Sequence, residues 1–205
     1  MLQLKKKGGI MIEAIYDTNA REFIESWLSA DMHDQYKVFE TLVPQGGKIL
    51  DGGCGSGRDS LYFLQKGYTV DAFDPSDEMI KYASEFTGLK VKKQKWEDLD
   101  AKDAYDAIWA SASLYHVSRG DMASVFEKIA AALKSKGILF ASFRDEDKDF
   151  VDSEGRALTS FNKDTFTSFL SPLDLFDIVA MTERKDSRKN KQDEIWLFAL
   201  LRKKN

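Results

Sequence analysis

Three glycines at alternate positions follow a short apolar segment near the start of the chain. The stretch ILDGGCGSGRDS, residues 49–60, contains Asp51 and then Gly53, Gly55 and Gly57. Glycine lacks a Cβ and adopts positive φ readily, so this spacing is typical of a loop whose backbone approaches a ligand closely. The GxGxG spacing departs from the dinucleotide fingerprint GxGxxG, whose third glycine would fall at Arg58, and no Gly-Lys-Ser/Thr of a P-loop follows. We therefore expect a cofactor loop, with a nicotinamide as a more remote alternative.

A carboxylate follows the next apolar segment, YTVDAF, at Asp74. In an open parallel sheet, ligands bind beyond the carboxyl ends of the strands, where the first two strand ends lie close together. A carboxylate there accepts hydrogen bonds from both hydroxyls of a ribose. The alternative for Asp74 is a turn or helix-capping acid ahead of Pro75.

Periodicity predicts the elements that hold these residues. Apolar residues at three-to-four spacing predict two helices within 19–43 and further helices over 58–67, 76–86, 121–137 and 162–171. Gly67 and Gly137 are expected to end their helices, and Ser76 to cap one, with Met79, Ile80 and Phe86 facing inward. Strands are expected at 48–51, 68–74, 89–95, 104–111, 138–143, 176–184 and 194–204.

The alternation of strand and helix predicts an α/β fold, a Rossmann-like doubly wound seven-stranded sheet. It should be mostly parallel, with one antiparallel strand, because the last two strands are joined by a turn without a helix. The N-terminal helices and residues 145–165 are expected to form a lid over the site. Arg184, Lys185, Arg188, Lys189 and Lys191 of the hairpin are expected to be solvated, with Arg188 alternatively reaching an anionic acceptor.

Length and composition are those of one soluble domain. The 205 residues, 43% hydrophobic and 31% charged, predict a single domain over 11–205. Residues 1–10 are expected to be either a disordered end or a mis-annotated extension upstream of a true start at Met11. The sequence has no apolar run of membrane-spanning length and no secretory signal, so a cytoplasmic location is expected. One cysteine and two distant histidines predict no metal site, and a net charge of −4 predicts no nucleic-acid partner.

Four segments together resemble a known family. ILDGGCGSGRDS, GYTVDAFDPSDEMI, WEDLD and YDAIWASASLYHV are similar to the successive motifs of class I S-adenosylmethionine-dependent methyltransferases, over about residues 12–204. The GRDS and SLYHV segments look most similar to small bacterial tellurite-resistance-type methyltransferases. Gly52 departs from the family, which usually has an aliphatic residue there, and the departure is expected to loosen strand packing slightly.

The resemblance implies S-adenosyl-L-methionine as cofactor and S-adenosyl-L-homocysteine as product. Asp51 would orient the glycine loop and meet the ammonium group, and the start of the following helix would face the carboxylate. Other expected cofactor neighbours are Asp74, Pro75, Met79, Trp96, Glu97, Asp98, Ala110 and Ser111. Met79 is alternatively a core residue, and the acids after Trp96 are alternatively a solvated loop.

Two further residues have candidate roles. The resemblance implies that Tyr16 folds over the methionine end of the cofactor; the alternative is an ordinary aromatic at a helix start. His116 is the candidate general base, because histidine titrates near neutrality, and its alternative is a structural histidine. Cys54 is not expected to be a nucleophile.

Methyl transfer is an in-line displacement, which positioning and exclusion of water accelerate. After the fourth strand the chain lacks both the Asn/Asp-Pro-Pro-aromatic motif of amino methylation and the Pro-Cys nucleophile of cytosine methylation. We therefore expect a small-molecule acceptor, such as a thiol or a metalloid oxyanion, and a monomer or homodimer. The alternatives are a methyltransferase acting on RNA or a protein side chain, and a non-catalytic S-adenosylmethionine-binding module.

Overall fold

Seven strands form one sheet in this computed structural model, which describes residues 12–153, 155–189 and 191–205. The expectations about Met11 and residues 1–10 lie outside the described residues. The strand order is β3-β2-β1-β4-β5-β9-β8. The bounds are β1 Lys48–Gly52, β2 Thr69–Asp74, β3 Lys92–Lys93, β4 Tyr105–Ala110, β5 Leu133–Arg144, β8 Phe176–Lys185 and β9 Ile195–Lys203.

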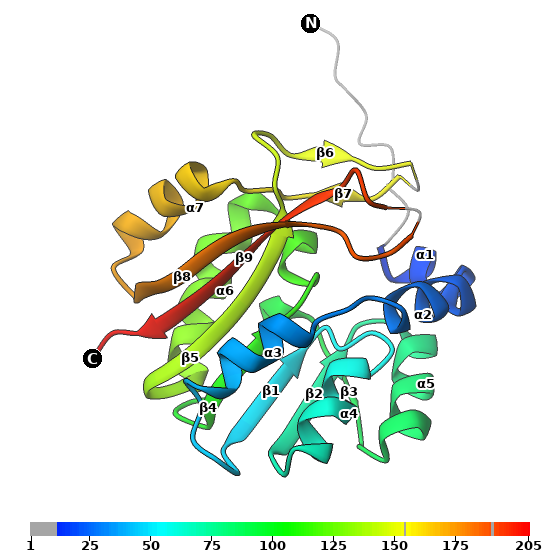
Figure 1. Cartoon of the computed structure of the whole chain (residues 1–205), viewed down its shortest axis with the longest axis horizontal. Helices are drawn as coiled ribbons and strands as arrows, with labels where there is room; N and C mark the ends of the chain where they lie inside the picture. Colours follow the sequence, from blue (N-terminus) through cyan, green and yellow to red (C-terminus); the bar gives the residue numbers. More distant parts are fainter. Residues whose placement is uncertain (1–11, 154, 190) are drawn as a thin grey trace, which may run out of the picture.

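The sheet is parallel from β3 to β5, and β9 runs antiparallel to both of its neighbours, β5 and β8 (Figure 1). This confirms the predicted Rossmann-like sheet with one antiparallel strand in a C-terminal hairpin. The chain winds in both directions from β1, so the carboxyl ends of β1 and β4 meet at the point where the winding reverses. Ligands of doubly wound sheets bind at that point.

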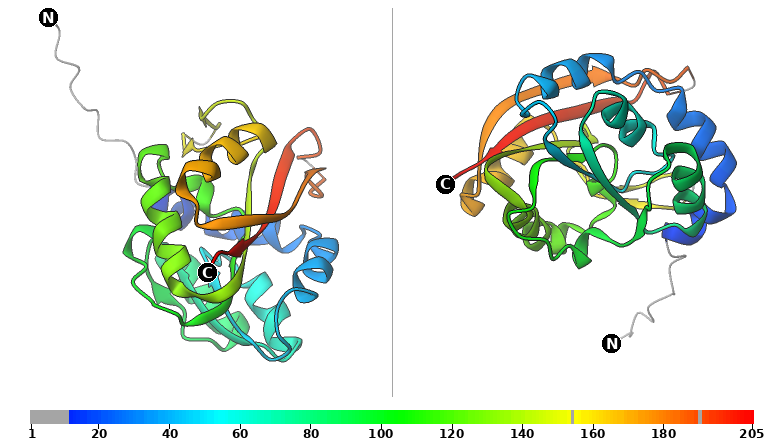
Figure 2. Two further views of the ribbon diagram at one scale, coloured as in Figure 1. Left: turned by 90° about the vertical axis from the view of Figure 1, so that its left-hand side faces the viewer. Right: turned by 90° about the horizontal axis from the view of Figure 1, so that it is seen from below.

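Helices lie on both faces of this sheet (Figure 2). They are α1 Ile12–Thr18, α2 Ala20–Leu28, α3 His33–Glu40, α4 Arg58–Gln65, α5 Asp77–Thr87, α6 Arg119–Ala132 and α7 Lys163–Leu170, with 3-10 turns at η1 Trp96–Asp98, η2 Leu114–His116 and η3 Ser171–Leu173. None of the helices in the described residues is both long and apolar enough to cross a bilayer.

Alternate residues of the central strands feed two separate cores, as the period of two in a strand requires. Ile49 and Trp109 pack with α3 and α4, whereas Leu50 and Ile108 pack with α6. Because the central strands are covered on both faces, they are apolar almost throughout.

Two expectations about the helices are wrong. The helix predicted to end at Gly137 ends at Ala132, because Leu133 already pairs with Tyr105 of β4. Phe86, predicted to face inward, is 39% exposed and stacks on Tyr82. The predicted cap is confirmed, since the Ser76 side chain accepts a hydrogen bond from the Met79 N–H.

The region 145–165 contains a second, two-stranded sheet of β6 Phe150–Val151 and β7 Ala157–Leu158. It lies at the same end of the molecule as α1 and α2 (Figure 1). These segments therefore gather over the carboxyl edge of the sheet, where the sequence predicts a lid.

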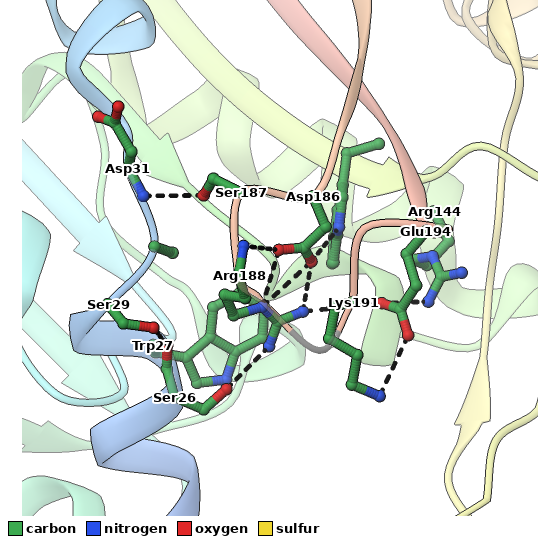
Figure 3. Close-up of polar contacts among 12 residues, drawn as sticks. Ser26, Trp27, Ser29, Asp31, Arg144, Asp186, Ser187, Arg188, Lys191 and Glu194 are labelled. Carbon is green, nitrogen blue, oxygen red and sulfur yellow. Dashed lines mark hydrogen bonds and ion pairs between the residues drawn. The ribbon is translucent and has the colours of Figure 1, made fainter.

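The hairpin turn is not simply solvated. Arg188 is only 8% exposed, and its guanidinium lies over the Trp27 ring at 3.9 Å while pairing with Asp186 at 2.5 Å (Figure 3). A buried arginine needs such a partner, because an unpaired charge in this position would be costly. The turn after β8 therefore packs on α2.

Candidate active site

Each glycine of the loop after β1 has its own structural reason. A Cβ on Gly53 would lie 2.5 Å from the Cβ of Ser113, so the loop packs directly against the segment that follows β4. Gly55 has φ +53° and borders open space, so its backbone conformation requires glycine. A Cβ on Gly57 would lie 2.8 Å from Thr87, so this glycine lets α4 pack against α5.

Asp74 holds the glycine loop in place. Its carboxylate accepts hydrogen bonds from the N–H of Gly55 at 2.9 Å and of Ser76 at 3.0 Å. Burial raises the pKa of Asp74 to about 6, against the lowering effect of these two donors. Asp74 therefore stabilises the turn at Pro75, which is the alternative role expected from the sequence. Each carboxylate oxygen still has a lone pair for a further donor.

A cavity of about 290 Å³ lies beside this loop and Asp74. It is lined by ten residues that the sequence predicts for the site: Tyr16, Gly53, Gly55, Asp74, Pro75, Met79, Trp96, Glu97, Ser111 and His116. Met79 is 3% exposed, as its alternative role of core residue requires, and its contact with the cofactor stays a prediction. Four predicted residues are not part of the lining: Asp51, Gly57, Asp98 and Ala110.

The indole of Trp96 occupies the space beside Gly52. A Cβ on Gly52 would lie 2.2 Å from the Trp96 ring, and Phe73 meets the same ring edge-on at 4.9 Å between centroids. The expectation that Gly52 loosens strand packing is therefore wrong. The missing side chain makes room for the Trp96 indole. The Trp96 Nε1–H is buried and has no hydrogen-bond partner among the described residues. Such a donor fits a ligand acceptor atom.

Helix α1 closes the cavity from the outside. Asp17 accepts a hydrogen bond from the Ser76 hydroxyl at 2.5 Å, which ties α1 to the start of α5. Glu13 forms an ion pair with Lys95, next to Trp96. These contacts join the cover to both predicted cofactor segments, after β2 and after β3.

Tyr16 connects α1 to the segment after β4. Its hydroxyl lies 2.9 Å from Nε2 of His116 and accepts a hydrogen bond from Arg156 at 2.8 Å. Arg156 can only donate to this oxygen, whereas the donor and acceptor roles in the contact with His116 depend on the histidine tautomer. Burial, assisted by Arg156, lowers the pKa of His116 to about 3. His116 is therefore neutral near neutral pH, and its Nδ1 has no partner among the described residues.

Sequence reasoning missed Arg58, which lies in the cavity lining at the start of α4. Its guanidinium pairs with Asp59 at 2.6 Å and donates to the carbonyl of Trp27 at 2.7 Å. Asp59 also accepts hydrogen bonds from Tyr36 and Trp109. The signal was available in the GRDS segment, whose arginine and aspartate begin the helix after the glycine loop.

Asp51 and Cys54 lie at either end of the turn into the loop. Asp51 accepts a hydrogen bond from the Ser60 hydroxyl at 2.6 Å, which joins β1 to α4 behind the loop. Burial raises the pKa of Asp51 to about 8 and also raises the pKa of the Cys54 thiol. A thiol with a raised pKa is a poor nucleophile at neutral pH, in line with the expectation for Cys54.

Comparison with known proteins gives matches to methyltransferases. Residues 49–137 match a family described as a methyltransferase domain. A ubiquinone biosynthesis O-methyltransferase of Xanthomonas axonopodis is 36% identical over 112 residues, 51% of this chain and 46% of that protein. A glycine N-methyltransferase of Rattus norvegicus is 29% identical over 120 residues, 49% of this chain and 41% of that protein. The chain spans about half the length of these curated relatives.

Among solved structures, the fold is similar to that of 1,6-didemethyltoxoflavin-N1-methyltransferase of Burkholderia thailandensis, crystallised with 1,6-didemethyltoxoflavin and S-adenosylhomocysteine. The TM-score is 0.76 with 19% sequence identity, over 100% of this chain and 94% of that one. The strand order and the glycine loop after β1 are consistent with the match of residues 49–137 to a methyltransferase domain. Residues 49–137 thus match a methyltransferase domain, within a chain that has the Rossmann-like fold of the solved methyltransferase structures.

Proposed function

We propose that this protein is an S-adenosylmethionine-dependent methyltransferase that acts on a small molecule. The observation that carries the proposal is the cavity between Gly55, Asp74 and Trp96. It combines open space at a glycine, a buried carboxylate with free lone pairs and an indole N–H that has no partner in the described part of the chain. These features fit a nucleoside with a free ribose diol.

Different residues around the cavity would contact different parts of the cofactor. Asp74 would accept hydrogen bonds from the ribose hydroxyls, and Trp96 would cover the adenine beside Glu97. The backbone N–H groups at the start of α4 would suit the methionine carboxylate at the opposite end. Asp51 would act through the loop that it supports. When bound, S-adenosylmethionine supplies a methyl carbon activated by the adjoining sulfonium.

The chain's contribution to the transfer would be positioning and exclusion of water. Tyr16 and α1 would close over the reacting atoms, and Ser111 after β4 would border them. His116 stays the proposed base for an acceptor that carries a proton. Two observations count against it: its Nε2 is already hydrogen-bonded to the Tyr16 hydroxyl, and its pKa of about 3 makes it a weak base.

A small-molecule acceptor is supported by the charges at the cavity. The cations in its lining, Arg58 and Lys95, are each paired with a carboxylate, Asp59 and Glu13. They do not form the unpaired basic surface that an RNA substrate requires. The predicted tellurite-type similarity and the thiol and metalloid-oxyanion acceptors stay predictions.

The test is isothermal titration with S-adenosylmethionine and S-adenosylhomocysteine. We expect binding by the intact protein and a loss of roughly 100-fold in Asp74→Ala, because the charged hydrogen bonds of the diol are lost. Asp77→Ala is the matched control, since Asp77 lies one turn away in an exposed pair with Lys93. If the intact protein binds neither ligand, or if Asp74→Ala binds them as tightly as Asp77→Ala does, the proposal is wrong.

A further inference from the structure

A second cavity, of about 400 Å³, adjoins the proposed cofactor cavity. The two share Trp27, Ser111 and Ala112 in their linings. Ser111 and Ala112 directly follow β4, at the centre of the sheet, so the shared boundary lies where the winding reverses.

The walls of this second cavity are aromatic and fixed. Trp27 and Trp196 meet at 76° with ring centroids 6.0 Å apart, and Phe198 adds a third ring. One face of Trp27 is covered by Arg188, whose guanidinium is itself held by Asp186 (Figure 3). The two indoles thus pack on each other and form an aromatic wall, which suits a flat ring.

The charged side chains around the cavity are largely neutralised. Asp34 pairs with Arg184 at 2.5 Å, and Asp186 pairs with Arg188 at 2.5 Å. The remaining charges, Asp31 and Lys185, are exposed and of opposite sign. A buried ionic ligand would find no unpaired counter-charge in this set, so the cavity favours an uncharged ligand.

One buried hydroxyl supplies a hydrogen bond. Ser142 is 1% exposed and lines the cavity, and its oxygen accepts the Ala112 N–H at 2.7 Å. Among the described residues, none accepts the proton of this hydroxyl in return. Since a buried donor is costly when unpaired, an oxygen or ring nitrogen of a ligand is its expected partner.

We infer that the second cavity binds the methyl acceptor, and that the acceptor is a flat, uncharged aromatic or heteroaromatic molecule of one or two rings. This inference rests on the proposed function. A lone pair on a ring nitrogen or hydroxyl oxygen of the acceptor forms the bond to the methyl carbon. The carbon–sulfur bond breaks with its electron pair left on sulfur, and the proton of the acceptor passes to the proposed base, His116. Trp27 lines both cavities beside the boundary where the two reactants meet, and Arg188 is a positioning residue for it.

The test measures coumarin binding to the S-adenosylhomocysteine-loaded protein by titration calorimetry. Coumarin is flat and uncharged and has a carbonyl acceptor, whereas δ-valerolactone has the same lactone without the aromatic ring. We expect coumarin to bind and δ-valerolactone not to bind. Ser142→Ala should weaken coumarin binding roughly 5- to 10-fold, because one hydrogen bond to the ligand is lost. Ala30→Phe should abolish binding by filling the cavity.

Both variants should bind S-adenosylhomocysteine like the intact protein, which shows that they fold. Ser135→Ala, at the exposed opposite end of β5, is the matched control and should change neither ligand. If S-adenosylhomocysteine binds but coumarin does not, or if coumarin binds Ser142→Ala and Ala30→Phe unchanged, the inference is overturned and the proposed function stands. If coumarin binds and responds to the variants while S-adenosylhomocysteine does not bind, the proposed function fails instead.

Discussion

The phenol oxygen of Tyr16 lies 2.9 Å from Nε2 of His116, and this contact joins the outermost helix to the segment after the central strand. Arg156 donates a hydrogen bond to the same oxygen. The histidine that the sequence predicts as a base is thus already engaged in a hydrogen bond through its Nε2. Its geometry is that of a residue that fastens the cover over the cavity.

His116 should therefore remain neutral across the physiological pH range. Its pKa is lowered to about 3, below the unfolded value of 6.5, so the stability that it contributes is present above 6.5 and is lost as the pH falls from there toward 3. NMR titration of the histidine ring protons should show one ring, assigned with His116→Gln, that does not titrate between pH 5 and 8. A midpoint near 6.5 for that ring would contradict the described burial.

Asp74 should make cofactor binding dependent on pH. Its pKa is raised to about 6, so in the free protein the burial penalty of the carboxylate grows, and stability falls, as the pH rises from 3.8 through 6. A ligand diol needs the ionised form, so S-adenosylhomocysteine affinity should decrease as the pH falls below about 6. Asp74→Asn should bind roughly 10-fold more weakly at neutral pH and lose this pH dependence. An identical pH dependence in Asp74→Asn would assign the effect to another group.

Gly52 and Trp96 should be energetically coupled. Gly52→Ala places a methyl group 2.2 Å from the indole, and overpacking of this kind costs about 1–3 kcal/mol. Trp96→Ala removes the obstruction, so Gly52→Ala should cost much less in the Trp96→Ala background. Urea denaturation of the four proteins of this cycle measures the coupling. Additive costs would show that the two side chains do not compete for one space.

Arg188→Met should destabilise the protein by about 3–5 kcal/mol, because it leaves Asp186 buried without its counter-charge. Asp186 also accepts the Trp196 Nε1–H at 2.9 Å, so the loss should reach the wall of the second cavity. Adding Asp186→Asn should restore part of the stability. Lys189→Met, at the exposed neighbouring position, is the control and should change the midpoint of thermal unfolding little. Equal midpoints of thermal unfolding for Arg188→Met and Lys189→Met would show that Arg188 is solvated, as the sequence predicts for this turn.

The central features of the site follow from the sequence because they depend on strand ends. Strand, glycine loop, helix and a second strand ending in an acid place Gly55 and Asp74 at one edge of a parallel sheet, whatever the remaining packing is. Ser76 is predictable as a cap for a similar reason, since its hydroxyl bonds within one turn. Local chemistry and fold topology are sufficient for these residues.

The parts that could not be predicted depend on contacts between distant segments. The run AAALKSKG favours a helix by propensity, but pairing of Leu133 with Tyr105 turns it into a strand, with Lys136 at φ +63°. Arg188 is buried only because the hairpin turn meets Trp27, more than 150 residues away. Nothing near Gly52 in the sequence shows that Trp96 needs its space.

The most direct test of the central claim is a crystal structure of the protein with S-adenosylhomocysteine. We expect the ribose hydroxyls on Asp74, the adenine against Trp96 and the sulfur at the boundary formed by Trp27 and Ser111. A ligand bound elsewhere, or one whose ribose does not contact Asp74, would contradict the assignment of the cavity and of the methyl-transfer site beside it.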